Sequence, residues 1–188
     1  MKILTLLGSP RADGNTERIL GWVEEALEKQ GHRTQRIHLG ALDIRGCRSC
    51  FACLESPDEP GCVLQDDALG VFQSMIEADG ILFATPLYMW SYSAQLKALF
   101  DRSLCLVRGY MSPDHQSFVE GRRAALLVSC GGPIDGNADA IGMIYPRFAK
   151  FAKLDSRGVH IFPHCTEPSN LPNTHGNRVH DLAGALAE

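Results

Sequence analysis

The sequence predicts an α/β fold in which helices cover both faces of a parallel β-sheet. Two observations predict this class: five short segments are predicted as strands, three of them with the apolar composition of buried strands, and helix-periodic segments alternate with them along the chain. Because crossovers between parallel strands are right-handed, this alternation gives a doubly wound, three-layer sandwich. A chain of 188 residues fits one domain, so we expect residues 1–188 to form a single unit.

The first third of the chain contains two of the expected strands. Residues 3–7 are an apolar run, and apolar positions between residues 19 and 27 recur at helical spacing before Gly31 ends the helix. Residues 33–39 follow as a short strand. Residues 40–66 then form a long cysteine-rich loop without clear periodicity, and loops of this length usually carry function.

The middle of the chain continues the alternation. Asp66 and Asp67 have the place of capping acids for a second helix, which ends before Gly80. Residues 80–85 are a continuous apolar run, as expected of a strand that helices cover on both faces. The apolar positions between residues 94 and 104 then predict a third helix.

The last third supplies two more strands and two helices. Residues 123–130 have a buried-strand pattern, and residues 137–152 form a helical segment that we expect Pro146 to kink or split. Residues 157–162 predict the last strand, and the apolar spacing of residues 179–186 predicts a closing helix.

Three loops are expected to meet beyond the carboxyl ends of the strands, where doubly wound sheets bind their ligands: residues 9–16, 86–93 and 129–136. In the first loop small residues lead into a helix start, whose unpaired backbone N–H groups favour a phosphate. The loop lacks the spacing of Walker and dinucleotide loops, which favours a mononucleotide. An ordinary strand-to-helix connection, with Asn15 or Thr16 as the N-cap, is the alternative.

The second of these loops, residues 86–93, is rich in aromatic side chains. Such rings stack on an isoalloxazine, and backbone N–H groups can bind its polar edge. The alternative is that Tyr88 and Trp90 pack at a subunit interface. Four histidines in the last third of the chain could suggest a metal site, but no carboxylates stand at ligand spacing from them. We therefore interpret these residues as surface or core histidines: His160, His164, His175 and His180.

Composition excludes several classes of function. The formal net charge of −4 without a basic stripe argues against a nucleic-acid partner, and no segment is apolar enough for a membrane partner. We read no signal peptide and expect a cytoplasmic location. Seven cysteines in a chain without an export signal indicate metal or redox chemistry rather than a disulfide framework. Cys105, Cys130 and Cys165 show no motif and suit core thiols, with Cys130 as an exception to follow because it enters the third loop.

Three segments together resemble the NADPH-dependent FMN reductase family of flavodoxin-like proteins, over about residues 1–132. They are the loop GSPRADGNT, the segment ATPLYMWSYSAQLKALFDR and the cysteine run before an Asp-Asp pair. The resemblance implies the strand order 2-1-3-4-5, bound FMN, NAD(P)H as a transient donor, a small-molecule or protein electron acceptor, and a homodimer or homotetramer. It also implies these FMN-binding residues: Ser9, Arg11, Asn15, Thr16, Pro86, Leu87, Tyr88, Met89, Trp90, Ser129, Gly131 and Gly132.

The family's helix-end Asp-Arg pair matches Asp101 and Arg102, for which we expect a helix-packing salt bridge. We name no catalytic side chain, because hydride transfer between a nicotinamide and a flavin demands no protein acid or base. The expected function is the NAD(P)H-dependent reduction of flavin or of a small acceptor through bound FMN. A non-enzymatic FMN-binding module is one alternative.

The cysteine run raises a second alternative. Cys47, Cys50 and Cys53 stand at three-residue intervals, and Cys62 can complete a four-cysteine set for a [4Fe-4S] cluster. Zinc fits less well, because its structural sites pair two separate short knuckles. The run resembles the iron-sulfur flavoproteins, whose fourth cysteine usually lies closer to the third. Packed or free thiols therefore stay open beside an electron carrier that uses FMN and a cluster.

Overall fold

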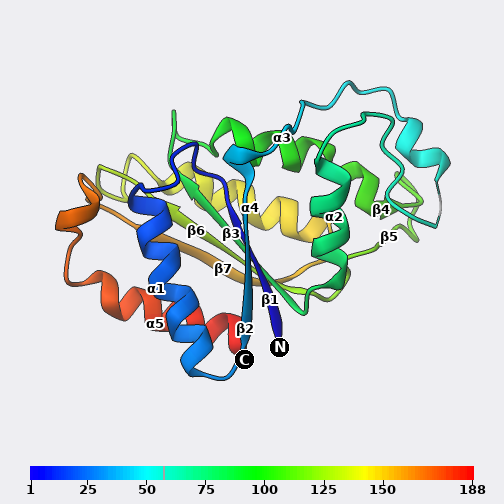
Figure 1. Ribbon diagram of the computed structural model, residues 1–188. Helices are drawn as coiled ribbons and strands as arrows, with labels where there is room; N and C mark the ends of the chain where they lie inside the picture. Colours follow the sequence, from blue (N-terminus) through cyan, green and yellow to red (C-terminus); the bar gives the residue numbers. More distant parts are fainter. Residues whose placement is uncertain (57) are drawn as a thin grey trace.

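A five-stranded parallel sheet forms the centre of the computed structural model, which describes residues 1–56 and 58–188 (Figure 1). Its strands run in the order β2-β1-β3-β6-β7, which is 2-1-3-4-5 when only the strands of this sheet are counted. The bounds of these strands are β1 Lys2–Leu7, β2 Arg33–His38, β3 Gly80–Pro86, β6 Arg123–Ser129 and β7 Asp155–Phe162.

The position of each strand in the sheet explains its composition. β1, β3 and β6 are almost entirely buried because helices cover both of their faces, and their sequences are continuous apolar runs. β2 is an edge strand with exposed polar residues. β7, the other edge, begins at Asp155, two residues before the expected start, beside an irregularity in its pairing at Ala124 and Leu126.

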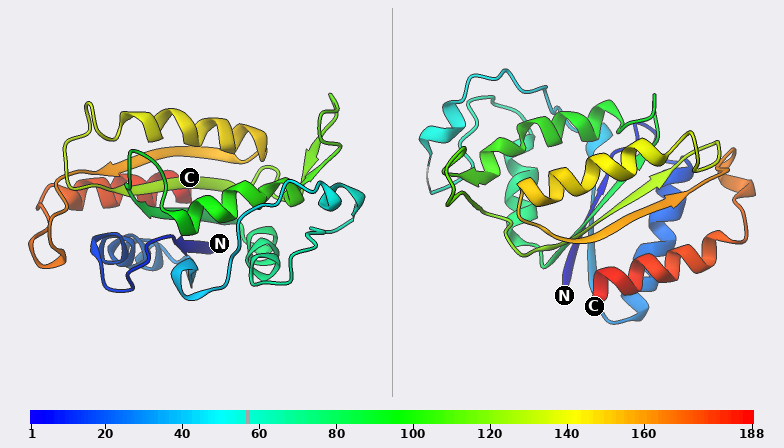
Figure 2. Two further views of the ribbon diagram at one scale, coloured as in Figure 1. Left: turned by 90° about the horizontal axis from the view of Figure 1, so that it is seen from above. Right: turned by 180° about the vertical axis from the view of Figure 1, so that it is seen from behind.

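Within the described residues, two helices cover one face of the sheet and three cover the other (Figure 2). The first layer consists of α1 Asn15–Lys29 and α5 His175–Ala187. The second consists of α2 Ala68–Glu77, α3 Ala94–Arg102 and α4 Asp139–Phe151. Each layer has its own apolar core against the sheet. No helix within the described residues is long and apolar enough to cross a membrane.

The structure corrects two details of the helix prediction. α4 is one element that continues through Pro146, so the expectation that it splits there is wrong. Pro146 lies on the exposed face of the helix, where water can bond the carbonyl that loses its partner. α3 ends at Arg102, and the expected end at Leu104 falls in a tighter 3₁₀ helix, Ser103–Leu106.

Several short elements were not predicted. An antiparallel pair joins β4 Val107–Arg108 to β5 Gln116–Ser117, and two-residue strands are too short to leave a periodic pattern. The described part of the chain also has 3₁₀ helices in loops, at Leu39–Ala41, Ala52–Glu55 and Pro168–Asn170.

Parallel register brings the ends of the central strands together. Leu7 pairs with Ala84, and Pro86 pairs with Ser129. The loops that follow β1, β3 and β6 therefore leave the same edge of the sheet side by side, as the sequence predicts.

Candidate functional site

The three loops surround an open cleft of about 500 Å³ at the carboxyl edge of the sheet. Its walls come from the loop after β1 and the start of α1, from the ends of β3 and β6 with the loops that follow them, and from one residue of the loop after β7. The lining residues are Ser9, Arg11, Asn15, Thr16, Pro86, Leu87, Tyr88, Ser129, Cys130, Gly131 and Cys165.

Close backbone contacts fix the first loop. A Cβ on Gly8 would lie 2.9 Å from the Leu96 Cβ and 3.0 Å from the Ala84 carbonyl oxygen, so only glycine fits there. The hydroxyl of Ser93, the N-cap of α3, donates a hydrogen bond to the Gly8 carbonyl. On the other side, the His38 Nε2 lies 2.8 Å from the carbonyl oxygen of Ser9. The loop is thus held between β2 and α3.

The start of α1 presents unused polar groups to the cleft. Its N-cap, Gly14, makes no side-chain cap, so the first backbone N–H groups of the helix are left to a ligand. The Asn15 Nδ2 donates to the Cys165 carbonyl at 3.0 Å, but the buried Asn15 Oδ1 has no partner among the described residues. The hydroxyl oxygens of Thr16 and Ser129 lie 2.7 Å apart. The uncapped N–H groups suit an anion better than an internally capped helix start does, whereas the Asn15 Oδ1 is an acceptor and needs a donor instead.

The aromatic loop folds as a tight hairpin. Tyr88 and Ser91 exchange two backbone hydrogen bonds of 3.1 and 3.0 Å across Met89 and Trp90. Both central residues have positive φ, 47° and 62°, as a type I′ turn requires, although bulky residues rarely adopt this conformation. Met89 and Trp90 are 82% and 55% exposed and do not line the cleft, whereas Tyr88 does.

Gly132 also lies outside the cleft lining. Its Cα faces the Asn137 side chain, which would lie 3.0 Å from an added Cβ. The remaining residues of the predicted FMN set line the cleft together: Ser9, Arg11, Asn15, Thr16, Pro86, Leu87, Tyr88, Ser129 and Gly131.

Two cysteines belong to the cleft wall: Cys130, which the sequence places at the third loop, and Cys165, which sequence reasoning missed as a site residue. The Cys130 N–H donates to the Phe162 carbonyl, and the Cys165 N–H donates to the Cys130 carbonyl at 2.9 Å. These bonds carry the loop after β7 alongside the end of β6. Burial raises the pKa of Cys165 to about 11 and also raises that of Cys130. For Cys165, the position just after the last strand of the sheet was the feature of the sequence that could have indicated a place in the cleft wall.

A second pocket, with about 630 Å³ of empty volume, adjoins the far end of α3. All four cysteines of the predicted metal set line it, and Cys105 forms part of the same wall. Cys47 and Cys50 are exposed, Cys53 and Cys62 are partly buried, and Cys105 is buried. Burial, reinforced by the nearby Cys62, raises the pKa of Cys53.

The side chains of this pocket do not converge on one point. Among residues 1–56 and 58–188, no group of three His, Cys, Asp or Glu side chains is arranged to hold one metal ion. A cubane cluster makes a different demand, since each of its four irons takes one thiolate. The four thiolates of a cubane bind different iron atoms, so they surround the cluster and need not converge on one point. Cysteines spread around one pocket fit such a cluster better than they fit a single metal ion.

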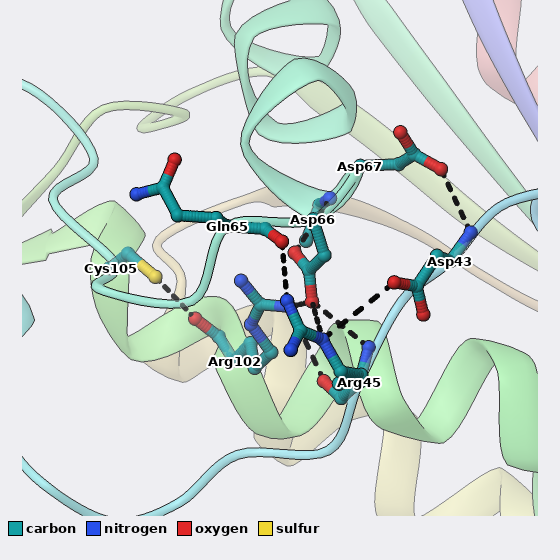
Figure 3. A network of polar contacts seen from close by, with 8 residues as sticks. Asp43, Arg45, Gln65, Asp66, Asp67, Arg102 and Cys105 are labelled. Atoms are coloured by element: carbon teal, nitrogen blue, oxygen red, sulfur yellow. Dashed lines mark hydrogen bonds and ion pairs between the residues drawn. The ribbon is translucent and has the colours of Figure 1, made fainter.

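Arg102, one of the residues that line the cysteine pocket, forms a buried ion pair with Asp66 (Figure 3). The Arg102 Nη1 donates to the Asp66 Oδ2, and the two side chains are 1% and 0% exposed. Asp66 also accepts from the backbone N–H groups of Arg45 and Ala68, at 3.0 and 3.2 Å. Burial opposes its charge, but these hydrogen bonds prevail and lower the pKa of Asp66.

This network refines two sequence interpretations. Asp66 does accept a bond at the start of α2, but its main partner is Arg102. The expected salt bridge of Arg102 exists, whereas Asp101 pairs with Lys97 on the surface, at 2.6 Å. Asp67 accepts from the backbone N–H of Asp43 and makes no side-chain cap of its own.

The histidines behave as the sequence indicates. The His175 Nε2 contacts the Pro163 carbonyl oxygen, and the His160 Nε2 contacts that of Arg157, both at 3.0 Å. Burial lowers the pKa of both imidazoles, which favours their neutral forms.

Comparisons with known sequences agree with this geometry. The family described as NADPH-dependent FMN reductase matches residues 1–146. An iron-sulfur flavoprotein of Methanosarcina thermophila is 36% identical over 139 residues, covering 74% of this chain and 68% of that protein. The Escherichia coli protein named FMN reductase (NADPH) is 30% identical over 102 residues, covering 54% of this chain and 47% of its own. The chain thus spans about half to two thirds of the length of these relatives.

Solved structures show the same fold. NAD(P)H:quinone oxidoreductase from Methanothermobacter marburgensis matches with a TM-score of 0.71 at 21% identity, over 100% of this chain and 93% of that one. An FMN-dependent NADH-azoreductase from Bacillus anthracis, solved in complex with FMN, matches with a TM-score of 0.70 at 13% identity, over 100% of both chains. The fold is therefore flavodoxin-like, and the chain belongs to the NADPH-dependent FMN reductase family of flavoprotein oxidoreductases, near its iron-sulfur flavoprotein relatives.

Proposed function

We propose that this protein is an electron-transferring flavoprotein that binds FMN in the cleft and a [4Fe-4S] cluster in the cysteine pocket. It takes electrons from NAD(P)H and delivers them to a small-molecule or protein acceptor. The observation that carries the proposal is the placement of all four motif cysteines around one pocket, separate from the cleft that contains the phosphate-type loop.

The cleft residues fit a flavin mononucleotide. FMN, when bound, supplies the hydride and electron chemistry. The free N–H groups at the start of α1 can hold the phosphate, and Ser9, Asn15 and Thr16 add side-chain donors to them. Arg11 adds a positive charge at the same wall. The segment from Pro86 to Tyr88 offers backbone groups and one aromatic ring to the isoalloxazine.

The cysteine pocket fits a cluster through four of its five thiols. Cys47, Cys50, Cys53 and Cys62 are exposed or partly buried, so an incoming iron can reach their sulfur atoms. Cys105 differs: its thiol donates to the Arg102 carbonyl at 2.8 Å, and burial raises its pKa to about 12. Cys105 thus stays a protonated thiol in the wall.

One helix connects the two sites. Ser93 at the start of α3 bonds the loop of the cleft, and Arg102 at its end lines the cysteine pocket. The nine residues of α3 span about 13 Å at 1.5 Å per residue. A rigid helix of this length fixes the separation of the two sites within the chain.

The exposed hairpin supports a further part of the proposal, a homodimer or homotetramer. Met89 and Trp90 present apolar surface at the mouth of the cleft, where a second subunit can cover it. Light scattering on the purified protein tests this part: a mass of two or four chains is expected, and a mass of one chain contradicts it.

Paired variants test the assignment of the two sites. Cys50→Ser is expected to lose iron and sulfide but keep FMN, while Arg11→Ala with Thr16→Ala is expected to lose FMN but keep iron. Cys105→Ser is the matched control and should keep both. Full iron in Cys50→Ser, or unchanged FMN affinity in the loop variant, contradicts the corresponding site.

NAD(P)H oxidation separates the enzyme from a passive carrier. We expect NADH or NADPH to bleach the flavin absorption anaerobically, and an added acceptor to restore it with turnover. A flavin that dithionite reduces but neither nicotinamide reduces contradicts the oxidoreductase and favours the non-enzymatic module.

A further inference from the structure

Arg102 is a buried cation with two unused hydrogen-bond donors. Its side chain is 1% exposed, and only its Nη1 is engaged, by the Asp66 carboxylate and by the Arg45 carbonyl oxygen at 3.3 Å. The Nε and Nη2 atoms are buried and have no partner among the described residues. A buried donor without a partner destabilises the folded protein, so a buried acceptor that bonds these two atoms would stabilise the arrangement.

The unused donors adjoin the cysteine pocket. Arg102 lines that pocket together with the four motif cysteines. Burial lowers the pKa of Arg102, but Asp66 and the adjacent Cys62 raise it, with a net increase. A helix-packing salt bridge explains the engaged edge of the guanidinium; it leaves the edge toward Cys62 unexplained.

We propose that Arg102 is a positioning residue for the cluster, whose Nε and Nη2 donate to the sulfur atoms held in the cysteine pocket while Asp66 fixes the guanidinium. The inference rests on the proposed function, because a cluster with four thiolates supplies the anionic acceptor. Arginine suits the task, since its planar fork can bond a carboxylate and a second acceptor at once.

The expected consequence is a higher reduction potential of the cluster. Adding an electron makes the cluster more negative, and a buried positive charge with N–H donors to its sulfurs stabilises that added charge. Arg48 lines the same pocket but is exposed, so solvent and salt screen its charge. The pocket thus contains a buried arginine and an exposed one for comparison.

Two matched pairs of variants test this role: Arg102→Lys against Arg48→Lys, and Arg102→Gln against Arg48→Gln. The lysine pair keeps the charge, and the ammonium group introduced by Arg102→Lys can still pair with Asp66, but the two unused donors disappear. Arg102→Lys therefore carries the test if Arg102→Gln fails to fold. Circular dichroism and FMN content report folding in each variant.

The first readout is the midpoint potential of the cluster, from an anaerobic dye titration followed by absorption and electron paramagnetic resonance. Arg102→Gln is expected to shift the one-electron equilibrium tenfold toward the oxidised form, a fall of about 59 mV. Arg102→Lys should shift in the same direction, and either Arg48 variant should shift less. Loss of the cluster from Arg102→Lys alone, with FMN retained, supports the same role. Unchanged potentials in folded Arg102 variants that keep their iron overturn it.

The second readout is the iron and acid-labile sulfide content of the wild type and of both Arg102 variants after anaerobic reconstitution. A wild-type protein that binds no iron contradicts the proposed function. A wild-type protein that binds the cluster, with unchanged potentials in both Arg102 variants, contradicts only the inference about Arg102.

Discussion

The hydroxyl oxygens of Thr16 and Ser129 lie 2.7 Å apart, although 113 positions separate the two residues in the chain. Both side chains are almost fully buried, at 2% and 4% exposure. The contact ties the first turn of α1 to the end of β6 and so joins the first and third loops of the cleft. The phosphate-type loop is thereby held in place from the sheet rather than by its own residues alone.

Thr16→Val is expected to weaken FMN binding about tenfold. The substitution keeps the shape of the side chain but removes the hydroxyl, and a hydrogen bond to a charged group contributes about 1.5–3 kcal/mol. Quenching of FMN fluorescence during titration measures the affinity. Thr34→Val is the matched control, since the Thr34 hydroxyl bonds Glu28 far from the cleft. Equal affinities in the two variants contradict the phosphate site.

Asp66→Asn is expected to destabilise the protein by about 3–5 kcal/mol, because it leaves the buried Arg102 cation without its counter-ion. Urea unfolding at pH 7 measures the change in the free energy of unfolding. Asp101→Asn serves as the control: it breaks the exposed pair with Lys97 and should cost less than about 1 kcal/mol. Similar losses in both variants contradict the buried pair.

The same carboxylate gives the stability a defined pH dependence. Since folding lowers the pKa of Asp66, its stabilising contribution is complete above the usual aspartate pKa of about 3.9. The contribution disappears as the pH falls through the still lower pKa of the folded state. Urea unfolding between about pH 2.5 and about pH 6, a range that spans the usual aspartate pKa, measures this dependence. As the pH is lowered, the free energy of unfolding should fall more steeply for wild type than for Asp66→Asn. An equal pH dependence in the two proteins contradicts the role of the Asp66 carboxylate.

The cysteines are expected to react with iodoacetamide in two groups. In cluster-free protein at neutral pH the exposed Cys47 and Cys50 should react first. Cys105 and Cys165 should be slow, because burial raises their pKa to about 12 and about 11. Peptide mass spectrometry follows each site. Rapid labelling of Cys165 in folded protein is incompatible with its position in the cleft wall.

Met89→Asn with Trp90→Gly is expected to stabilise the single chain by about 1–2 kcal/mol or more and to weaken the proposed subunit contact. The pair places the preferred residues of a type I′ turn at two positions that now have positive φ with bulky side chains. Thermal and urea unfolding of the monomeric protein measure the gain, and light scattering reports the subunit contact. A loss of stability in the monomer contradicts the turn assignment.

The sequence predicted the layers of the fold and the convergence of the three loops. Buried parallel strands such as Gly80–Pro86 leave continuous apolar runs, and strand ends in a parallel sheet must meet at one edge. The continuity of α4 through Pro146 was not predictable from the residue type, because it depends on which face of the helix the proline occupies. The two-residue strands of the hairpin β4–β5 left no periodic signal.

Long-range contacts limited the prediction of the sites. The spacing of Cys47, Cys50 and Cys53 indicated one pocket, but Cys105 joins its wall only because α3 turns into a 3₁₀ helix there. Cys165 enters the cleft through the backbone bond of its N–H to Cys130, which no local motif signals. The partner of Arg102 also required the fold, since Asp66 lies 36 positions away while Asp101 is adjacent.

The most direct test is an absorption spectrum of anaerobically purified protein, with FMN, iron and acid-labile sulfide assayed on the same sample. We predict a flavin spectrum over a broad iron-sulfur shoulder, with about one FMN and about four irons per chain, as a single cubane requires. A clean flavin spectrum without iron after anaerobic reconstitution contradicts the cluster and leaves an FMN reductase whose cysteines are structural. Protein that binds neither group contradicts the proposed function altogether.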